Sequence, residues 1–356
     1  MQIHKQRETP LIIAIGNVPS SGSTLVADLM DSLPFAVCGP ETRLFAVKGY
    51  FENFPRLKAK GFFSSRSPVI YEVRQRMLPD APNAYGFDGE SIHRCVKESN
   101  SFQDFCEKFF HTYAALRWKR CRVFFEKTPE NIHCAKLFLD SFKDGIFLHI
   151  VRNPFYVYKS LIKRGFLPFI AANTWLIDEA SAYEVRNHKR FFTISYEDLI
   201  KNPFETVVNF LRKIGIRFDP EELEALYKNN TYRNQQIRRV KSWSVKRYGT
   251  IEDANRKEMG SEDWRALKFM LTTKISHRYA REFGLAECSF HEMARLNGYS
   301  FADFMSHVGG SNRDETIRCD FSSWCFLLKK FAFDWMYGDC RLNSYLSYLK
   351  PVERCP

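Results

Sequence analysis

The chain has 356 residues, of which 45% are hydrophobic, so it can bury one large core and still carry an appendage. Its formal net charge of +12 favours anionic ligands, nucleic acid or acidic lipid as partners, without choosing among them. No apolar segment has the length of a membrane span or a secretory signal, so the sequence predicts a cytoplasmic protein. Neither the 10 cysteines, which form no CxxC pair, nor the 9 histidines have the spacing of metal ligands, and no metal is predicted.

Short β-rich runs alternate with segments of helical periodicity through the first two thirds of the chain. Strands are predicted at 11–15, 122–125, 146–151 and 190–195, and helices at 23–32, 102–120, 132–142, 155–164, 173–187 and 204–214. Pro154 and Pro203 suit the first turns of helices, and Gly165 and Gly215 suit helix ends. This alternation predicts an α/β fold in which helices flank a parallel sheet.

The other segments predict a less regular organisation. Residues 50–100 are rich in proline, glycine, serine and charge, and we expect loops there around a short helix, as an insertion that covers a site. A helix is expected at about 261–283, and no strand–helix alternation follows it. We therefore predict one domain at 1–287 and a helical extension at 288–356. The apolar residues of 321–337 predict packing on the core or on a second subunit, with an interfacial membrane helix as the alternative.

A loop of small residues follows the first strand. After Gly16, the residues Ser21, Gly22, Ser23 and Thr24 lie at a helix start, where free backbone N–H groups and the helix dipole suit phosphate or sulfate. The loop departs from G-x-x-x-x-G-K-[ST], because five residues separate the glycines and serine replaces the lysine, which argues against an ATPase or an ordinary kinase. A strand-to-helix turn with a serine cap is the alternative interpretation.

The loop resembles the P-[RK]-S-G-[ST]-[ST]-L segment of sulfotransferases, which holds the 5′-phosphate of 3′-phosphoadenosine 5′-phosphosulfate (PAPS). Three further segments, FFEKTPENI, HIVRNPFYVYKSLIKRG and SYEDLIKNP, resemble the same family in order, so the resemblance covers roughly residues 11–285. It implies a P-loop-like parallel sheet and PAPS as the co-substrate.

The resemblance also implies roles for five residues. Arg152 and Ser160 match ligands of the nucleotide's 3′-phosphate, and Arg164 matches a further ligand in the tyrosylprotein branch. Tyr196 is expected at the nucleotide, and Lys127 at the sulfonate and the leaving phosphate. Guanidinium groups bind phosphate oxygens bidentately, which agrees with these assignments. The residues alone leave other interpretations open. Arg152 can form a salt bridge at a strand end, Ser160 can be a serine on a helix surface, and Lys127 can be an ordinary loop lysine.

The segment CGPETRLF resembles the C-G-x-E-T-R segment of tyrosylprotein sulfotransferases. There the residue matching Glu41 is the general base, and the residue matching Arg43 helps to arrange the acceptor. A base is useful because a hydroxyl becomes a strong nucleophile only as its proton leaves. An ion pair between Glu41 and Arg43 in a loop is the alternative.

The loop departs from the family at Ser20, where the family has Arg or Lys directly after the loop proline. Loss of a positioned charge at a developing oxyanion typically costs about 10²–10³ in rate. Three explanations stay open. Lys127 carries the function with Ser20 as a weak donor, which we favour; Lys48 or a lysine of the basic run 232–248 substitutes; or the protein binds nucleotide and turns over poorly.

The basic run 232–248 matches the loop that closes over the 3′-phosphate in the family, although its aromatic residues also suit single-stranded nucleic acid. The sequence therefore predicts a PAPS-dependent sulfotransferase that acts by in-line displacement on a hydroxyl of a small molecule, glycan, lipid or peptide tyrosine. No nucleic-acid motif is present, so no nucleic-acid partner is expected. A catalytically weak nucleotide-binding relative is the main alternative, and a nucleic-acid-binding protein the lesser one. The C-terminal helix is a candidate homodimer contact.

Overall fold

The computed structural model describes residues 10–59, 85, 87, 89–117, 119–230, 274–275, 288–299, 321–322, 324–325 and 328. The predicted nucleotide lid at 232–248, the short helix expected near 69–77 and most of the helix expected at 261–283 lie outside these residues.

A five-stranded parallel sheet forms the centre of the molecule, in the order β2-β3-β1-β4-β5. Its strands are β1 (Leu11–Asn17), β2 (Ala36–Cys38), β3 (Val123–Lys127), β4 (Ile146–Val151) and β5 (Phe191–Ser195). All seven residues of β1 are buried, as expected for a parallel strand that is covered on both faces. The predicted α/β fold with a parallel sheet is confirmed.

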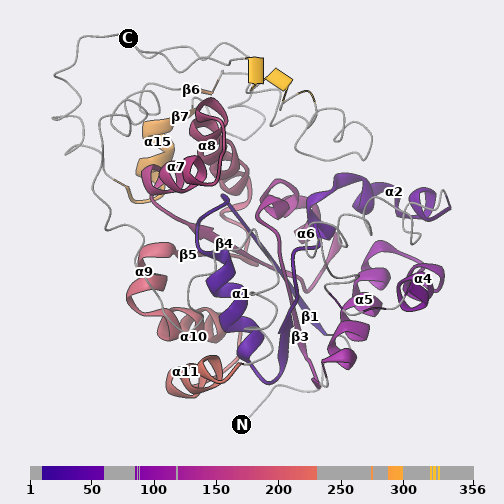
Figure 1. The fold of residues 1–356 in the computed structure, drawn as a ribbon. Coiled ribbons are helices and arrows are strands. Elements are labelled where there is room, and N and C mark those ends of the chain that lie inside the picture. Colours follow the sequence, from indigo (N-terminus) through magenta and orange to yellow (C-terminus); the bar gives the residue numbers. More distant parts are fainter. Residues whose placement is uncertain are drawn as a thin grey trace, which may run out of the picture.

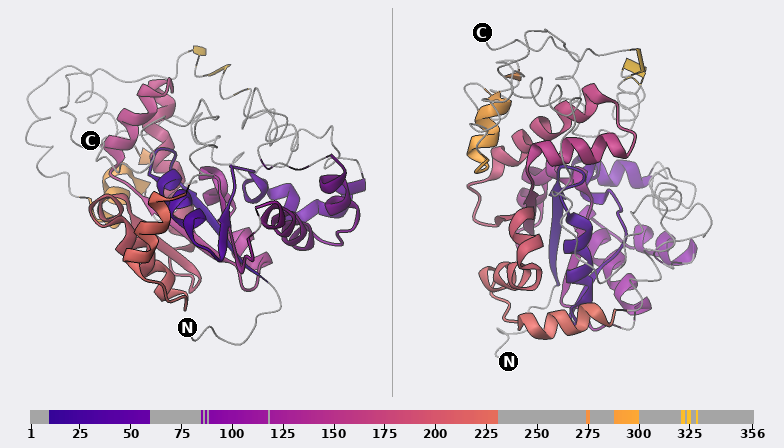
Figure 2. Two further views of the ribbon diagram at one scale, coloured as in Figure 1. Left: turned by 60° about the horizontal axis from the view of Figure 1, so that its bottom comes forward. Right: turned by 60° about the vertical axis from the view of Figure 1, so that its left-hand side comes forward.

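Helices cover both faces of this sheet (Figure 1). One side carries α1 (Ser23–Ser32), α9 (Tyr196–Lys201), α10 (Pro203–Lys213) and α11 (Pro220–Lys228). The other side carries α2 (Lys48–Ala59), α4 (Gly89–Lys97), α5 (Phe102–Leu116) and α6 (Ala135–Ser141). The helices α7 (Pro154–Lys163) and α8 (Pro168–Val185) lie beyond the carboxyl ends of the strands, with α15 (Phe290–Leu296) against α8. Figure 2 shows the sheet between the two groups of helices from two further sides.

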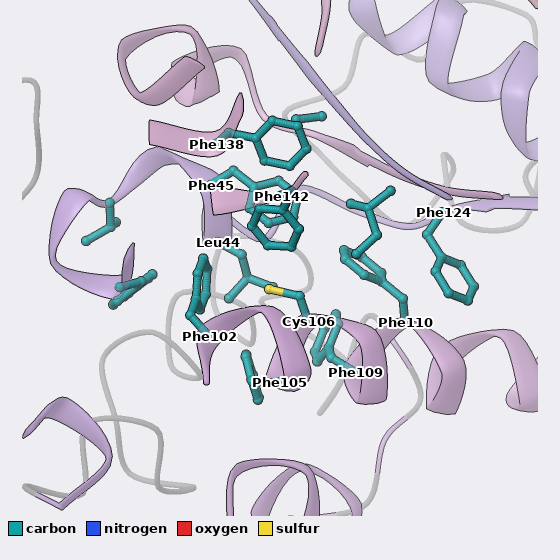
Figure 3. Close-up of a cluster of buried hydrophobic side chains, with 14 of the residues drawn as sticks. Leu44, Phe45, Phe102, Phe105, Cys106, Phe109, Phe110, Phe124, Phe138 and Phe142 are labelled. Carbon is teal, nitrogen blue, oxygen red and sulfur yellow. The ribbon is translucent and has the colours of Figure 1, made fainter. Parts of the chain in front are cut away.

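Alternate strand residues face two different cores. Ile12, Ala14 and Phe124 belong to a core rich in phenylalanine, whereas Ile13 and Ile15 belong to a mainly aliphatic core under α1 and α10. Figure 3 shows the aromatic core between η1 (Leu44–Ala46), α5 and α6, where the Phe45 and Phe138 ring centroids are 4.8 Å apart. Tilted and edge-to-face rings of this kind add to the free energy gained from burying their area.

The structure differs from the sequence prediction at several places, and the unpredicted strand β2 is one of them. Most of α2 and all of α4 lie within 50–100, where loops were predicted. Tyr50 and Phe54 of α2 are buried, so tertiary packing stabilises this helix despite Pro55 and a kink. The helix α8 begins at Pro168 and not near residue 173, because proline occupies its first turn. Lys274–Ile275 (β6), inside a predicted helix, pair antiparallel with Cys288–Ser289 (β7), a non-local contact that local periodicity cannot reveal.

Two parts of the predicted extension at 288–356 are described. In α15, Met293 and Ala294 are buried. Further on, Phe321 is 83% exposed and Leu328 59% exposed, so these side chains do not pack on the core as one interpretation expected. A contact with a second subunit or a membrane surface stays a prediction, as does the boundary at residue 287. Among the residues with described placement, no helix has both the length and the apolar character to span a membrane.

Candidate active site

The loop between β1 and α1 has the backbone of an anion seat. Ser20 (φ 74°) and Gly22 (φ 88°) are both left-handed and flank Ser21, an alternation that can turn successive backbone N–H groups toward one point. The first turn of α1, with Ser23 and Thr24, receives no side-chain cap. The Ser21 hydroxyl is fully buried and has no hydrogen-bond partner within the described part of the chain. These features suit a bound phosphate or sulfate, because such a group satisfies free N–H donors at a helix start.

Tyr196 packs directly against this loop. A Cβ atom added to Gly22 would lie 2.5 Å from Tyr196 Cδ2, so only glycine fits here. Tyr196 is the first residue of α9, and the Ser195 hydroxyl caps that helix by accepting the Asp198 N–H at 3.1 Å. The close approach holds the tyrosine ring beside the anion seat.

Arg152, which follows β4, joins the loop to the tyrosine. It is 4% exposed, and its Nη1 donates to the Ser20 carbonyl at 2.6 Å. Its guanidinium carbon lies 4.1 Å from the centroid of the Tyr196 ring, a cation–π geometry. Trp175 Nε1 donates to the Arg152 carbonyl at 3.0 Å and fixes the backbone there. The structure therefore brings Arg152, Tyr196 and the loop together.

Arg164, directly after α7, contacts the same loop residue from the other end of that helix. Its Nη1 donates to the Ser20 hydroxyl at 3.0 Å, and its guanidinium carbon lies 5.7 Å from the Phe166 ring centroid. The Arg164 N–H also donates to the Ser160 carbonyl at 3.2 Å, so Ser160 lies one turn earlier. Ser20 thus accepts one arginine at its carbonyl and another at its hydroxyl.

Lys127, the last residue of β3, forms an ion pair with Glu41, which lies in the loop after β2. Lys127 ends β3 opposite Ile15 of β1, and its Nζ donates to Glu41 Oε1. The lysine side chain is 1% exposed and the glutamate side chain 30% exposed, so the carboxylate is the more accessible member of the pair. The predicted base and the predicted cation are in contact.

Glu126, which the sequence interpretation missed, holds this pair in place. Its carboxylate accepts the Thr42 N–H (3.0 Å), the Thr42 and Thr128 hydroxyls (both 2.7 Å) and Asn131 Nδ2 (2.5 Å). Burial raises the pKa of Glu126, and the hydrogen bonds oppose that rise. A carboxylate in an otherwise apolar strand run was the available signal, because such a group is buried only when it is paired.

Two sequence profiles of known protein families match the chain. A sequence profile described as the sulfotransferase family matches residues 10–220, and one described as the sulfotransferase domain matches residues 172–296. The chain belongs to the sulfotransferase family. No curated protein sequence matches it.

Sulfotransferases are among the solved structures that this sulfotransferase matches. The sulfotransferase domain of the Synechococcus PCC 7002 olefin synthase is 17% identical, with a TM-score of 0.52, and the match covers 84% of this chain and 98% of that one. The mouse sulfotransferase SULT7A1 complexed with PAP is 11% identical, with a TM-score of 0.37, and the match covers 83% and 90% of the two chains.

Two other basic residues of the sulfotransferase were also assigned candidate roles, and the structure shows Arg43 buried and Lys48 in an ion pair. Arg43, predicted to arrange the acceptor, is 3% exposed and left-handed (φ 58°), and its N–H donates to Thr128 Oγ1 at 3.1 Å. Lys48, one candidate for the missing cation, forms an ion pair with Glu52 at 3.3 Å on α2. The lysines of 232–248 lie outside the described residues.

Buried histidines of the sulfotransferase pair with carboxylates of α8. His133 Nε2 lies 3.0 Å from Asp178 Oδ1, and His149 Nε2 lies 3.3 Å from Glu179 Oε1. Burial raises the pKa of Asp178, while His133 lowers it in part. Within the described ranges, no group of three histidine, cysteine, aspartate or glutamate side chains could hold a metal ion.

Proposed function

We propose that this sulfotransferase moves a sulfonate group from PAPS to a hydroxyl acceptor. The observation that supports this most strongly is the convergence at one edge of the sheet. Lys127 pairs in register with Ile15, and the loop and Arg152 begin just beyond the paired ends of β1 and β4. Ligands of open parallel sheets bind at this edge, outside the carboxyl ends of the strands.

The residues present fit the nucleotide. The buried Ser21 hydroxyl and the uncapped first turn of α1 suit a phosphate, and Arg152 with Tyr196 supplies a cation beside an aromatic ring. In the proposed complex the nucleotide is held by Ser21, Gly22, Ser23, Thr24, Arg152, Ser160, Arg164 and Tyr196. PAPS supplies an activated sulfonate whose leaving group is the 5′-phosphate.

Glu41 and Lys127 are proposed to perform the chemistry. As the acceptor oxygen forms its bond to sulfur, Glu41 takes the hydroxyl proton, and the bond between sulfur and the 5′-phosphate oxygen breaks. The products are a sulfate ester and adenosine 3′,5′-bisphosphate (PAP). Lys127 lies beside Glu41 and supplies positive charge, since transfers of this kind depend on positioning and charge stabilisation. The acceptor is a hydroxyl of a small molecule, glycan, lipid or peptide tyrosine.

A nucleotide-binding relative with little turnover is the second candidate, favoured by Ser20 at the position of a basic residue. Titration calorimetry with PAP tests the binding that both candidates share. Release of PAP from PAPS in the presence of phenols, sugars and lipid alcohols separates them. Tight PAP binding without turnover of any acceptor supports the second candidate, and the absence of PAP binding contradicts both. Salt-dependent binding of random oligonucleotides without PAP binding would indicate a nucleic-acid-binding protein.

A further inference from the structure

Ser20 lacks a charge, yet two guanidinium groups lie against it. Arg152 is buried, donates to the Ser20 carbonyl and stacks on Tyr196, so its position is fixed beneath the loop. Arg164 is exposed, and among the described residues the Ser20 hydroxyl is its one side-chain hydrogen-bond partner. An arginine has five N–H donors, so this contact orients Arg164 and leaves most of its donors available to a ligand.

The contact with Ser20 places Arg164 at the loop whose residues are proposed to hold the 5′-phosphate. Ser20 directly precedes the buried hydroxyl of Ser21 and the start of α1, the anion seat of the site. Two other described lysines were candidates for a cation at this point. Lys127 pairs with Glu41 and is proposed above to serve the transferred sulfonate, and Lys48 pairs with Glu52 on α2.

We propose that Arg164, oriented by the Ser20 hydroxyl, supplies the positive charge at the 5′-phosphate leaving group, an assignment that rests on the function proposed above. Charge develops on the oxygen between sulfur and phosphorus as that bond breaks, and a positioned cation there stabilises the transition state. The cation thus comes from the end of α7, about 140 residues after the loop, and it replaces a side chain that the loop itself lacks. Arg164 is then a catalytic residue and more than a general nucleotide contact.

Binding of two mononucleotides tests the assignment without turnover. Arg164→Gln should weaken binding of 5′-AMP by about 10- to 100-fold, the effect of one charged hydrogen bond, and change binding of 3′-AMP less than twofold. Lys163→Gln removes an equal charge from the neighbouring exposed residue and should affect neither. A loss confined to 3′-AMP would overturn the proposal, because Arg164 would then serve the other phosphate.

Turnover and relocation of the charge provide the second test. Arg164→Gln should lower kcat by about 10²–10³, and the double variant Ser20→Arg with Arg164→Gln should recover at least tenfold of that loss. Ser20→Arg keeps a Cβ atom at the same backbone position, so the left-handed conformation is no less accessible than with serine. Unchanged kcat in Arg164→Gln, or a double variant as slow as the single one, contradicts the proposal while leaving sulfonate transfer intact. A wild-type protein that binds no PAP would instead contradict the proposed function itself.

Discussion

The two halves of the candidate site are built by different means. The half at β1, β4 and β5, called here the loop half, depends on backbone conformation. Ser20 and Gly22 are left-handed, and Tyr196 can pack on Gly22 only because glycine has no side chain. The half at β2 and β3 depends on side chains, because Glu126 links Thr42 to Thr128 and Asn131 and so brings Glu41 to Lys127. The loop of the first half can therefore be recognised from a short sequence, whereas the ion pair of the second joins Glu41 to Lys127, 86 positions later.

A substitution in the half at β2 and β3, called here the acid half, should have the largest effect on turnover. Glu41→Gln removes the proposed base and should lower kcat by about 10²–10⁴, while the Kd for PAP changes less than twofold, because the nucleotide contacts lie on the other half. Stopped assays of PAP release, together with PAP titrations, measure both quantities. Glu52→Gln, which breaks the exposed ion pair with Lys48, is the matched control and should leave kcat unchanged. A fully active Glu41→Gln variant contradicts the role of Glu41 as the base.

A substitution in the loop half should weaken nucleotide binding. Gly22→Ala places a Cβ atom within 2.5 Å of Tyr196 at a φ of 88°, so the ring must move and the Kd for PAP should rise at least tenfold, about 1.4 kcal/mol. Gly215→Ala is the matched control, because its φ is 83° and no atom lies within 4 Å of the added Cβ. Both variants should lose about 1–2 kcal/mol of unfolding free energy from the left-handed conformation, but only Gly22→Ala should weaken PAP binding. Equal PAP affinities in the two variants would show that the tyrosine contact does not matter.

Much of the fold could be predicted because its signals are local. The run at 146–151 is the strand β4, and the helix expected at 23–32 is α1, since burial and end signals coincide there. The three-residue strand β2 carries too little pattern to be found. The loop with Arg152 and Tyr196 was likewise predictable from segments that follow strands. Contacts between distant side chains could not be predicted, because they produce no periodic pattern in the sequence. The four hydrogen bonds that Glu126 accepts and the contact of Arg164 with Ser20 are examples.

The side-chain network of the acid half should contribute measurably to stability. In Glu126→Gln an amide N–H group replaces a carboxylate oxygen, and it must face either Asn131 Nδ2 or the donors of Thr42 and Thr128. Two donors that face each other in a buried place cost about 1–3 kcal/mol, so the free energy of unfolding should fall by that amount. Urea titration measures it, with exposed Glu98→Gln as the control. An unchanged free energy of unfolding would show that the network does not hold the acid half.

The smallest effect should come from the contact between the C-terminal segment and the loop half. The Tyr299 hydroxyl donates to Glu197 Oε2 at 2.9 Å, and Glu197 Oε1 accepts the N–H of Asn153, the residue after Arg152. Burial raises the pKa of Tyr299, so its hydroxyl stays a donor through the neutral range. Tyr299→Phe removes this bond but leaves Glu197 its backbone partner, so the free energy of unfolding should fall by only about 0.5–1.5 kcal/mol.

The variant Tyr299→Phe also tests whether residues 288–299 stabilise the loop half in particular. If they do, added PAP should raise the Tm of Tyr299→Phe by less than it raises the wild-type Tm, because Asn153 and Arg152 are held less firmly before binding. Tyr227→Phe, a buried tyrosine of α11 on the aliphatic core, is the control for the loss of a buried hydroxyl away from Arg152. Equal PAP-induced shifts in the wild type and both variants would mean that the segment stabilises the fold without supporting the site. The predicted boundary at residue 287 would then separate the residues that support nucleotide binding from those that do not, even though the hydrogen bond between Tyr299 and Glu197 crosses it.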